Sequence, residues 1–216
     1  MKQKLIHQIW GLVFKTFRKK RFAQFVSRIQ PQMHERVLDI GGYPSTWEGQ
    51  QHLVAEIHIA NVHEITPPAD PGNIHLQIAD GCVLPFADHS FDIVFSNSVI
   101  EHVGDFERQQ AFAREVSRVG GRLWVQTPAR EFWIEPHFMT PFIHWLPPGW
   151  QHRLARNFSV WGWLTRPDKR QVADFINDIR LLTHAEMARL FPGCAILREK
   201  VCLGLFTKSY IAVRTA

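Results

Sequence analysis

The chain has 216 residues, of which 45% are hydrophobic and 21% are charged. At roughly 150 residues per domain, this length predicts one domain with an elaboration, and the composition excludes a wholly disordered chain, a collagen and a long coiled coil. The three cysteines form no CxxC pair, which argues against a disulfide scaffold and a structural zinc site of the usual spacing. A reducing, cytoplasmic compartment fits this cysteine usage.

The formal net charge of +5 is concentrated at the N-terminus. Residues 1–30 hold eight Lys and Arg and no acid, so the remaining chain is mildly acidic. This distribution argues against nucleic acid as a partner, because the body of the chain is not basic.

Residues 1–30 also have the apolar spacing of an amphipathic helical segment. One stripe runs from Leu5 to Phe17, and a second, formed by Phe22, Phe25, Val26 and Ile29, follows the basic run at residues 18–21. We expect two short helices, or one helix with a break near that run, and we expect the second stripe to pack on the sheet. The first stripe either caps the domain or contacts the inner membrane surface through residues 1–21, with its cations facing anionic headgroups.

Strand and helix patterns alternate along the rest of the chain. We expect strands at residues 36–40, 54–60, 74–79, 91–96 and 123–127, a helix over 104–118, a helix opened by a capping box at 183–186, and two closing strands at 195–201 and 209–213. The alternation predicts an α/β, Rossmann-like sheet of seven strands, parallel except for an antiparallel C-terminal hairpin, with helices on both faces. We expect one domain over residues 1–216, closed by the helix and strand pair of 181–216.

Residues 128–180 interrupt the alternation directly after the fifth strand. Five of the 13 prolines lie in residues 128–148, and five of the 8 tryptophans lie in residues 133–163. A long irregular insertion at the carboxyl end of a strand is where a lid or a substrate wall belongs. The alternative interpretation is a packed helical subdomain with a solvated basic rim.

Short motifs at the strand ends carry the functional signal. The first strand reads V-L-D-I-G-G, D-G-C-V-L-P-F follows the third strand, and S-F-D-I-V opens the fourth, which runs into S-N-S-V-I-E-H-V. Glycine after a strand lets a ligand approach the backbone, although the dinucleotide pattern GxGxxG is absent. As an ordered set over residues 36–127, these motifs resemble the class I S-adenosylmethionine-dependent methyltransferases, specifically the type 11 group.

The resemblance implies that residues 36–127 form a core that binds S-adenosylmethionine and its product S-adenosylhomocysteine. Asp39 and the two glycines after it would hold the amino-acid part, Asp80 would accept a hydrogen bond from the adenine amino group, and the end of the fourth strand would lie under the methionyl part. Family members usually carry an acid for the ribose at the position of Asn61, whose amide can accept one hydrogen bond and donate another. The implied cofactor-binding residues are Asp39, Gly41, Gly42, Asn61, Asp80, Gly81, Cys82, Asn97 and Ser98.

The candidate catalytic residues are His102, Glu135 and His137. They follow the fourth and fifth strands, whose carboxyl ends share one edge of the sheet, and histidine suits proton acceptance near neutral pH. His102 as an ordinary helix-start or core residue is the competing interpretation. A metal site built from His137, His144 and His152 lacks compact ligand spacing, so we expect no metal.

The expected function is methyl transfer from S-adenosylmethionine to an oxygen or nitrogen nucleophile of a small or lipid-linked acceptor. The aromatic insertion offers an apolar wall for such an acceptor. No N-P-P-Y-like tetrad follows the fourth strand, which argues against amino methylation of nucleic acid bases. The alternative is a non-catalytic module that binds the cofactor or its product and acts as a scaffold or a membrane-surface subunit.

Overall fold

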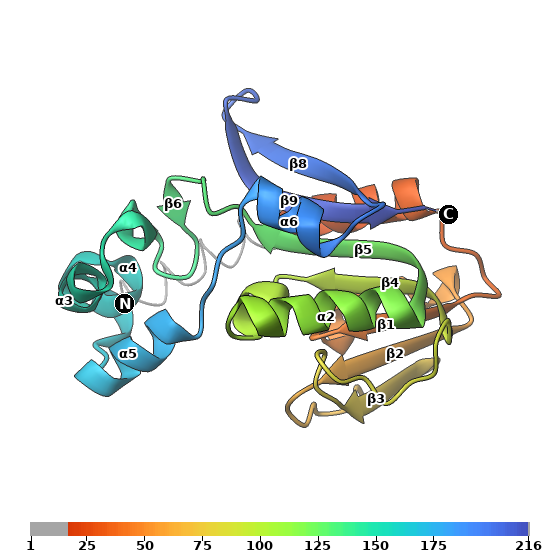
Figure 1. The fold of residues 1–216 in the computed structure, drawn as a ribbon. Helices are drawn as coiled ribbons and strands as arrows, with labels where there is room; N and C mark the ends of the chain where they lie inside the picture. Colours follow the sequence, from red (N-terminus) through yellow and green to blue (C-terminus); the bar gives the residue numbers. More distant parts are fainter. Residues whose placement is uncertain (1–16, 216) are drawn as a thin grey trace.

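A seven-stranded mixed sheet forms the centre of the molecule in the computed structural model, which describes residues 17–215 (Figure 1). Its strand order is β3-β2-β1-β4-β5-β9-β8. β9 runs antiparallel to both of its neighbours, β5 and β8, and all other neighbouring strands pair in parallel. This architecture confirms the expected fold class. The strands are β1 (Arg36–Ile40), β2 (Glu56–Asn61), β3 (Ile74–Ile78), β4 (Phe91–Asn97), β5 (Gly120–Pro128), β8 (Ala195–Val201) and β9 (Phe206–Arg214).

Both faces of the sheet are covered, which explains why its central strands read as continuous apolar runs. One face packs on α2 (Phe106–Val119) and α6 (His184–Leu190), which lie on the same side of the sheet in Figure 1. The opposite face packs on the helix over residues 17–29 and on Trp47, which follows β1. The predicted capping box opens α6, because Thr183 and Glu186 each bond the other's backbone N–H.

The connections between parallel strands carry little helix. The β1–β2 connection contains only η1 (Pro44–Thr46) and η2 (Gln51–Leu53), and a loop joins β2 to β3. Between β4 and β5 the chain forms η3 (Ile100–His102) and then α2. Because β1 pairs in parallel with both β2 and β4, the carboxyl ends of these three strands lie near one another, at the edge where open α/β sheets bind ligands.

The helix over residues 17–29 is continuous, so the expected break near residues 18–21 is wrong for this part of the chain. Phe25 and Ile29 are buried on the sheet with Phe95 and Trp124, which confirms that the second apolar stripe packs on the domain. Arg21 is buried as well, whereas residues 18–20 of the basic run are exposed. The first stripe, apart from Phe17, lies outside the described residues.

The insertion over residues 128–180 is largely helical rather than irregular, and its role as a lid or a substrate wall stays a prediction. Phe138, Ile143, Ala155 and Val172 form its own core. It leaves the sheet at the carboxyl end of β5 and returns beside the same point, because Ala129 and Leu182 form a parallel bridge. Its elements are β6 (Ile134–Glu135), β7 (Thr140–Pro141), η4 (Ile143–Trp145), α3 (Pro148–Phe158), α4 (Val160–Thr165) and α5 (Lys169–Asn177).

The structure contains no membrane-spanning candidate among the described residues. No helix within residues 17–215 combines the length and the apolar character that a bilayer crossing requires.

Candidate functional site

Asp39 lies near the end of β1 and is almost completely buried, with 1% of its surface exposed. Its Oδ2 accepts a hydrogen bond from Nε1 of Trp47 at 2.8 Å, but its Oδ1 is buried without a hydrogen-bond partner. Burial disfavours the charged form and raises the pKa of Asp39 to about 7, against the opposing effect of the Trp47 hydrogen bond. A buried acceptor without a donor costs free energy, so a ligand that donates to Oδ1 would remove that cost.

Close contacts require glycine at two positions after β1. Gly41 has a φ of +72°, a conformation that favours glycine, and a Cβ there would lie 2.5 Å from Cγ2 of Val99. A Cβ on Gly42 would lie 2.0 Å from Oδ2 of Asp39. The Asp39 carboxylate therefore lies directly against the Gly42 backbone, and any side chain at position 42 would displace it.

Asn61, at the end of β2, lies next to the same turn. Its Nδ2 donates to the Gly42 carbonyl over 3.4 Å, and its Oδ1 accepts from the His63 backbone N–H over 3.3 Å. Both hydrogen bonds are longer than the usual 2.7–3.2 Å, so they hold the amide weakly. The structure thus brings Asn61 to the turn at Gly42, while its role toward a ribose stays a prediction.

Asp80, after β3, is held by two donors. Its Oδ1 accepts from the Cys82 backbone N–H at 2.9 Å, and its Oδ2 accepts from Nη2 of Arg108 in α2 at 2.7 Å. Burial raises its pKa, but the hydrogen bonds from Arg108 and Cys82 outweigh burial and leave the pKa below its usual value. Asp80 is thus ionised at neutral pH, and an adenine amino group would have to share a carboxylate that Arg108 already contacts.

Gly81 and Cys82 pack into the protein rather than into open space. A Cβ on Gly81 would lie 2.8 Å from the Phe112 ring, and the Cys82 thiol donates to the Arg108 carbonyl. Burial raises the pKa of Cys82 to about 11, which makes this thiol a poor nucleophile.

The end of β4 is tied to two other elements. Oδ1 of Asn97 accepts from Nη1 of Arg21 at 2.7 Å, which links the helix over residues 17–29 to this edge of the sheet. Ser98 has a φ of +58°, and both its backbone N–H and its hydroxyl donate to Gln126 in β5. Asn97 and Ser98 therefore lie at the expected edge with their local geometry fixed by neighbours.

The three predicted catalytic residues form one connected group. Nε2 of His102 lies 3.1 Å from Nε2 of His137, and Nδ1 of His137 lies 2.6 Å from Oε1 of Glu135. Burial alone would lower the pKa of His137, but the adjacent Glu135 carboxylate outweighs burial and raises it. The sequence could not show this contact, since His102 and His137 are 35 residues apart.

Two acids outside the predicted catalytic set complete this group. Asp178, just after α5, contacts Nδ1 of His102 through its Oδ2 at 3.0 Å. Glu101 is fully buried, and its Oε2 accepts from the Thr127 hydroxyl at 3.0 Å. Burial raises the pKa of Glu101, while the two histidines oppose that effect. The S-N-S-V-I-E-H motif gave a signal for Glu101, whereas no local signal marks Asp178.

Backbone contacts hold the two halves of this group together. Arg180 donates its N–H to the Glu101 carbonyl at 2.8 Å, which fixes the returning end of the insertion against η3. Oε2 of Glu135 accepts from the Phe138 N–H at 2.6 Å, which fixes the carboxylate beside His137. The group therefore lies between the carboxyl ends of β4 and β5 and the insertion.

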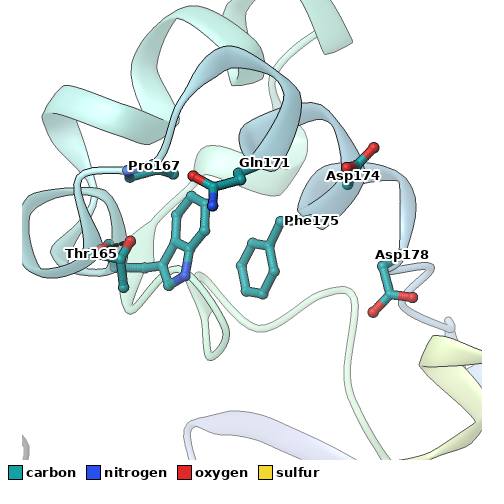
Figure 2. A pocket seen from close by; sticks show the side chains of 7 residues that line it. Thr165, Pro167, Gln171, Asp174, Phe175 and Asp178 are labelled. Carbon is teal, nitrogen blue, oxygen red and sulfur yellow. Dashed lines mark hydrogen bonds between the residues drawn. The ribbon is translucent and has the colours of Figure 1, made fainter.

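Two hollows lie on the insertion side of this group. One, of about 250 Å³, is lined by Glu135, Arg130 and Arg180 among others. The other, of about 490 Å³, has Thr165 and Pro167 at one end and Asp174 and Asp178 at the other (Figure 2). The stacked rings of Trp161 and Phe175, 4.3 Å apart, line the second hollow. Asp178 thus borders this hollow and also contacts His102.

Sequence comparisons relate part of the chain to known methyltransferases. A family model described as a methyltransferase domain matches residues 52–125. A protein of Mycolicibacterium gilvum named "uncharacterized methyltransferase" is 33% identical over 97 residues, which cover 39% of this chain and 36% of that protein. The chain spans about a third of the length of the curated relatives it matches.

Comparisons with solved structures extend the likeness to nearly the whole chain. A chain from the complex between the Haloferax volcanii Trm112 methyltransferase activator and a methyltransferase superposes with a TM-score of 0.58 at 13% identity, covering 94% of this chain and 91% of that one. A protein from Pyrococcus horikoshii superposes with a TM-score of 0.57 at 13% identity, covering 93% and 89%. At this identity the comparisons show a shared fold.

Asp39 should make the stability of the ligand-free protein depend on pH. Its pKa is about 7 in the folded state and near 3.8 in the unfolded chain, so the folded state binds the extra proton between these values. This group therefore reduces stability as pH rises through that window, by about 4 kcal/mol once both states are ionised. We expect Asp39→Asn to shrink the difference in unfolding free energy between pH 5.5 and pH 8, measured by chemical denaturation.

The matched control is Asp88→Asn, since Asp88 is an exposed acid paired with Arg118. It should leave the pH dependence as in the wild type. An equal change in both variants would show that Asp39 is not the titrating group.

Proposed function

We propose that this chain, in which residues 52–125 match a methyltransferase domain, transfers the methyl group of S-adenosylmethionine to an oxygen or nitrogen nucleophile. One observation carries the proposal. Two histidines meet at the carboxyl ends of β4 and β5, beside the β1–β4 crevice where the strand order reverses. In open α/β sheets, ligands bind at that crevice.

The cofactor side of the proposal depends on Asp39 and Asp80. When bound, S-adenosylmethionine would supply a methyl group activated by its sulfonium. The partnerless Oδ1 of Asp39 fits the ammonium group of the cofactor's amino-acid part, because that cation donates hydrogen bonds and favours the ionised carboxylate. Asp80, already ionised, suits the adenine amino group, and Asn61 would reach the ribose by giving up its two long hydrogen bonds.

The acceptor side depends on His102, His137 and Glu135. The imidazole Nε2 atoms would receive the hydrogen of the attacking O–H or N–H group and hold it facing the cofactor. Glu135 would keep the His137 ring in a fixed orientation through its 2.6 Å contact with Nδ1. The insertion covers this side, which supports its role as the wall that excludes water from the transfer.

A surface formed by the β8–β9 hairpin and the start of the insertion favours a lipid-linked acceptor over a freely soluble one. Leu205 is 78% exposed beside the fully exposed Leu203, and Phe206 contacts Trp133. The basic helix start lies along the same hairpin, since Arg21 pairs with Glu199 and Lys208 lies over the Phe17 ring. Residues 18–20 of that helix are exposed cations, and exposed apolar side chains together with exposed cations are typical of contact with an anionic membrane surface.

The adenine assignment predicts a selective loss of affinity. We expect Asp80→Ala to weaken binding of S-adenosylhomocysteine by about 5- to 150-fold, because losing the acceptor leaves a cofactor donor unpaired at a cost of about 1–3 kcal/mol. Isothermal titration calorimetry measures this directly. Asp88→Ala is the matched control, since it also removes a carboxylate paired with an arginine, and wild-type affinity in Asp80→Ala would remove Asp80 from the site.

The catalytic assignment predicts a loss of turnover without a loss of cofactor binding. We expect His137→Ala to lower methyl transfer about 100-fold, since a positioned proton acceptor contributes about 10²–10⁴-fold, while the affinity for S-adenosylhomocysteine stays unchanged. The assay supplies methyl-labelled S-adenosylmethionine with a lipid extract or a panel of small hydroxyl and amine compounds, and measures S-adenosylhomocysteine formation. His144→Ala is the control. A wild-type protein that binds the product but methylates nothing would instead indicate the non-catalytic module.

The membrane contact predicts that one exposed leucine matters. We expect Leu203→Ser to lower recovery with phosphatidylglycerol-containing vesicles in a flotation assay about 10-fold, since a buried leucine contributes about 1.5–3 kcal/mol. Met33→Ser, which changes another exposed apolar residue that does not belong to this surface, should have no effect. Recovery that is the same with neutral and anionic vesicles, or the same for both variants, would argue against membrane contact at this surface.

A further inference from the structure

The two histidines between the core and the insertion face each other in an arrangement that needs a positive charge between them. Nδ1 of His102 contacts the Asp178 carboxylate, and Nδ1 of His137 contacts the Glu135 carboxylate. A carboxylate can only accept, so each Nδ1 carries the hydrogen and each neutral ring presents a lone pair at Nε2. The two Nε2 atoms are 3.1 Å apart, so their lone pairs repel each other unless a cation or a proton lies between them.

We propose that Glu101, His102 and His137 bind one divalent metal ion. Ligand nitrogens about 2.0–2.1 Å from an ion, at about 90–110° to each other, are about 2.8–3.4 Å apart, which matches the observed Nε2 separation of 3.1 Å. The candidate ligand atoms of all three residues lie within 4.8 Å of one another. Oε1 of Glu101 is buried without a hydrogen-bond partner, so it is available as the third ligand.

The surroundings of these three residues resemble those of established metal sites. Histidine ligands nearly always donate their other ring N–H to a carboxylate or a carbonyl, which fixes the ring and strengthens the ligand. Glu135 and Asp178 do this for the two rings here. The His102 side chain is 32% exposed, so an ion can enter from solvent.

The ligand types favour a transition ion over magnesium or calcium. Imidazole suits zinc, iron, cobalt and nickel, whereas magnesium and calcium prefer oxygen ligands. Two imidazoles and one carboxylate on one side of the ion leave further positions open, as in catalytic zinc sites. A divalent ion would also offset the charge of the three carboxylates around the two rings.

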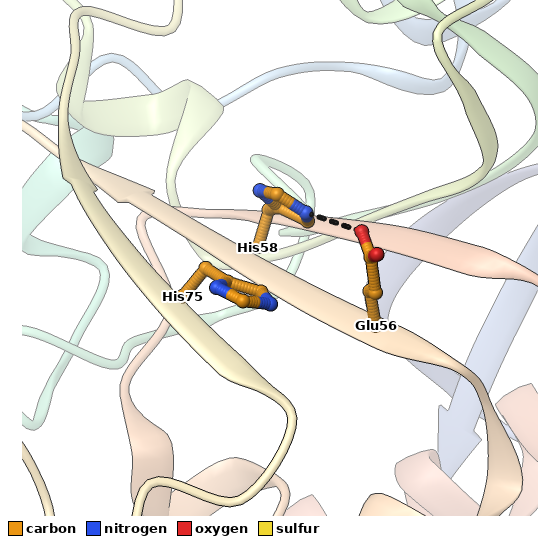
Figure 3. A group of neighbouring side chains, drawn as sticks. All are labelled: Glu56, His58 and His75. Carbon is orange, nitrogen blue, oxygen red and sulfur yellow. Dashed lines mark hydrogen bonds and ion pairs between the residues drawn. The ribbon is translucent and has the colours of Figure 1, made fainter.

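A second group of similar composition lacks this geometry. Glu56, His58 and His75 lie together on β2 and β3, as Figure 3 shows. There the two rings are stacked, with centroids 4.7 Å apart, so their in-plane lone pairs do not converge on one point. Glu56 is also engaged by Arg36 at 2.9 Å. Similar residue types thus give one group that fits an ion and one that packs as stacked rings.

What the ion does rests on the proposed methyl transfer, whereas its binding does not. With both Nε2 atoms bound to it, an ion here would take over their part in activating the acceptor. It would attract the acceptor hydroxyl and favour the loss of its proton to water, since divalent ions lower the pKa of bound hydroxyl groups. The acceptor oxygen then forms the bond to the methyl carbon as the carbon–sulfur bond breaks. The electron pair of that bond stays on sulfur, which leaves the neutral thioether S-adenosylhomocysteine.

Metal titration of the full chain tests the site without any methyl acceptor. We expect the chelator-treated protein to bind one equivalent of Zn²⁺ by calorimetry, and Co²⁺ to give the visible absorption of an ion with nitrogen ligands. Affinity should fall by at least about 100-fold in the His102→Ala/His137→Ala variant and in Glu101→Gln. It should fall about 10- to 100-fold in Asp178→Asn, which loses only the contact to the ligand ring.

Two control variants make the result specific. His144→Ala removes a neighbouring histidine of the insertion, and His75→Ala disrupts the second group, so both should bind Zn²⁺ as the wild type does. Unchanged Zn²⁺ binding in both Glu101→Gln and the double variant would overturn the proposal. Wild-type protein that binds no ion would also overturn it, and a proton shared between the two rings would then account for their contact. Because Glu101→Gln keeps the size of the side chain and its acceptor for Thr127, it remains informative if the double variant fails to fold. Zinc binding with no methyl transfer to any acceptor would contradict the proposed function and leave the metal site standing.

Discussion

The contact between η3 and the returning end of the insertion holds the acceptor side of this molecule together. Glu101 makes this contact through its backbone carbonyl, which accepts from the Arg180 N–H. Its side chain accepts from Thr127 at the end of β5. One buried residue thereby fixes β4, β5 and the insertion relative to one another. His102 comes from the core, His137 and Asp178 come from the insertion, and their contacts exist only because this junction is fixed.

Two buried carboxylates define the two sides of the site. Asp39 on the cofactor side and Glu101 on the acceptor side each satisfy one oxygen with an internal donor and leave the other buried without a partner. Burial raises the pKa of both groups, so each is held in a state that an added cation or donor would relieve. The fold accepts this free-energy cost at the edge of the sheet where ligands bind, and sites of strain and unpaired polarity commonly mark function.

The helix over residues 17–29 does more than cover one face of the sheet. Its apolar side packs on Phe95 and on Trp47, and Trp47 donates the hydrogen bond to Asp39. Its Arg21 reaches Asn97 at the end of β4 and Glu199 in β8. The helix over residues 17–29 therefore packs against both the cofactor edge and the β8–β9 hairpin. Arg21 links that hairpin to the end of β4.

Sequence periodicity and motif order determined the sheet, the succession of its strands along the chain and the capping box of α6. The same motifs predict the cofactor residues after β1, β3 and β4 through the family resemblance. These features are local, because a strand's apolar pattern and the residue types at its end depend on near neighbours in the chain. The tertiary structure decided the rest. In the sequence Arg21 belongs to a basic run that is expected to be solvated, yet in the structure it is buried and bonded to Asn97 and Glu199. These partners lie 76 and 178 residues away, so no local pattern reveals them. No local pattern marks Asp178. His102 comes into contact with His137 and with Asp178 only when the insertion folds back onto η3. Side chains far apart in sequence meet through packing, which the pattern of any one segment does not encode.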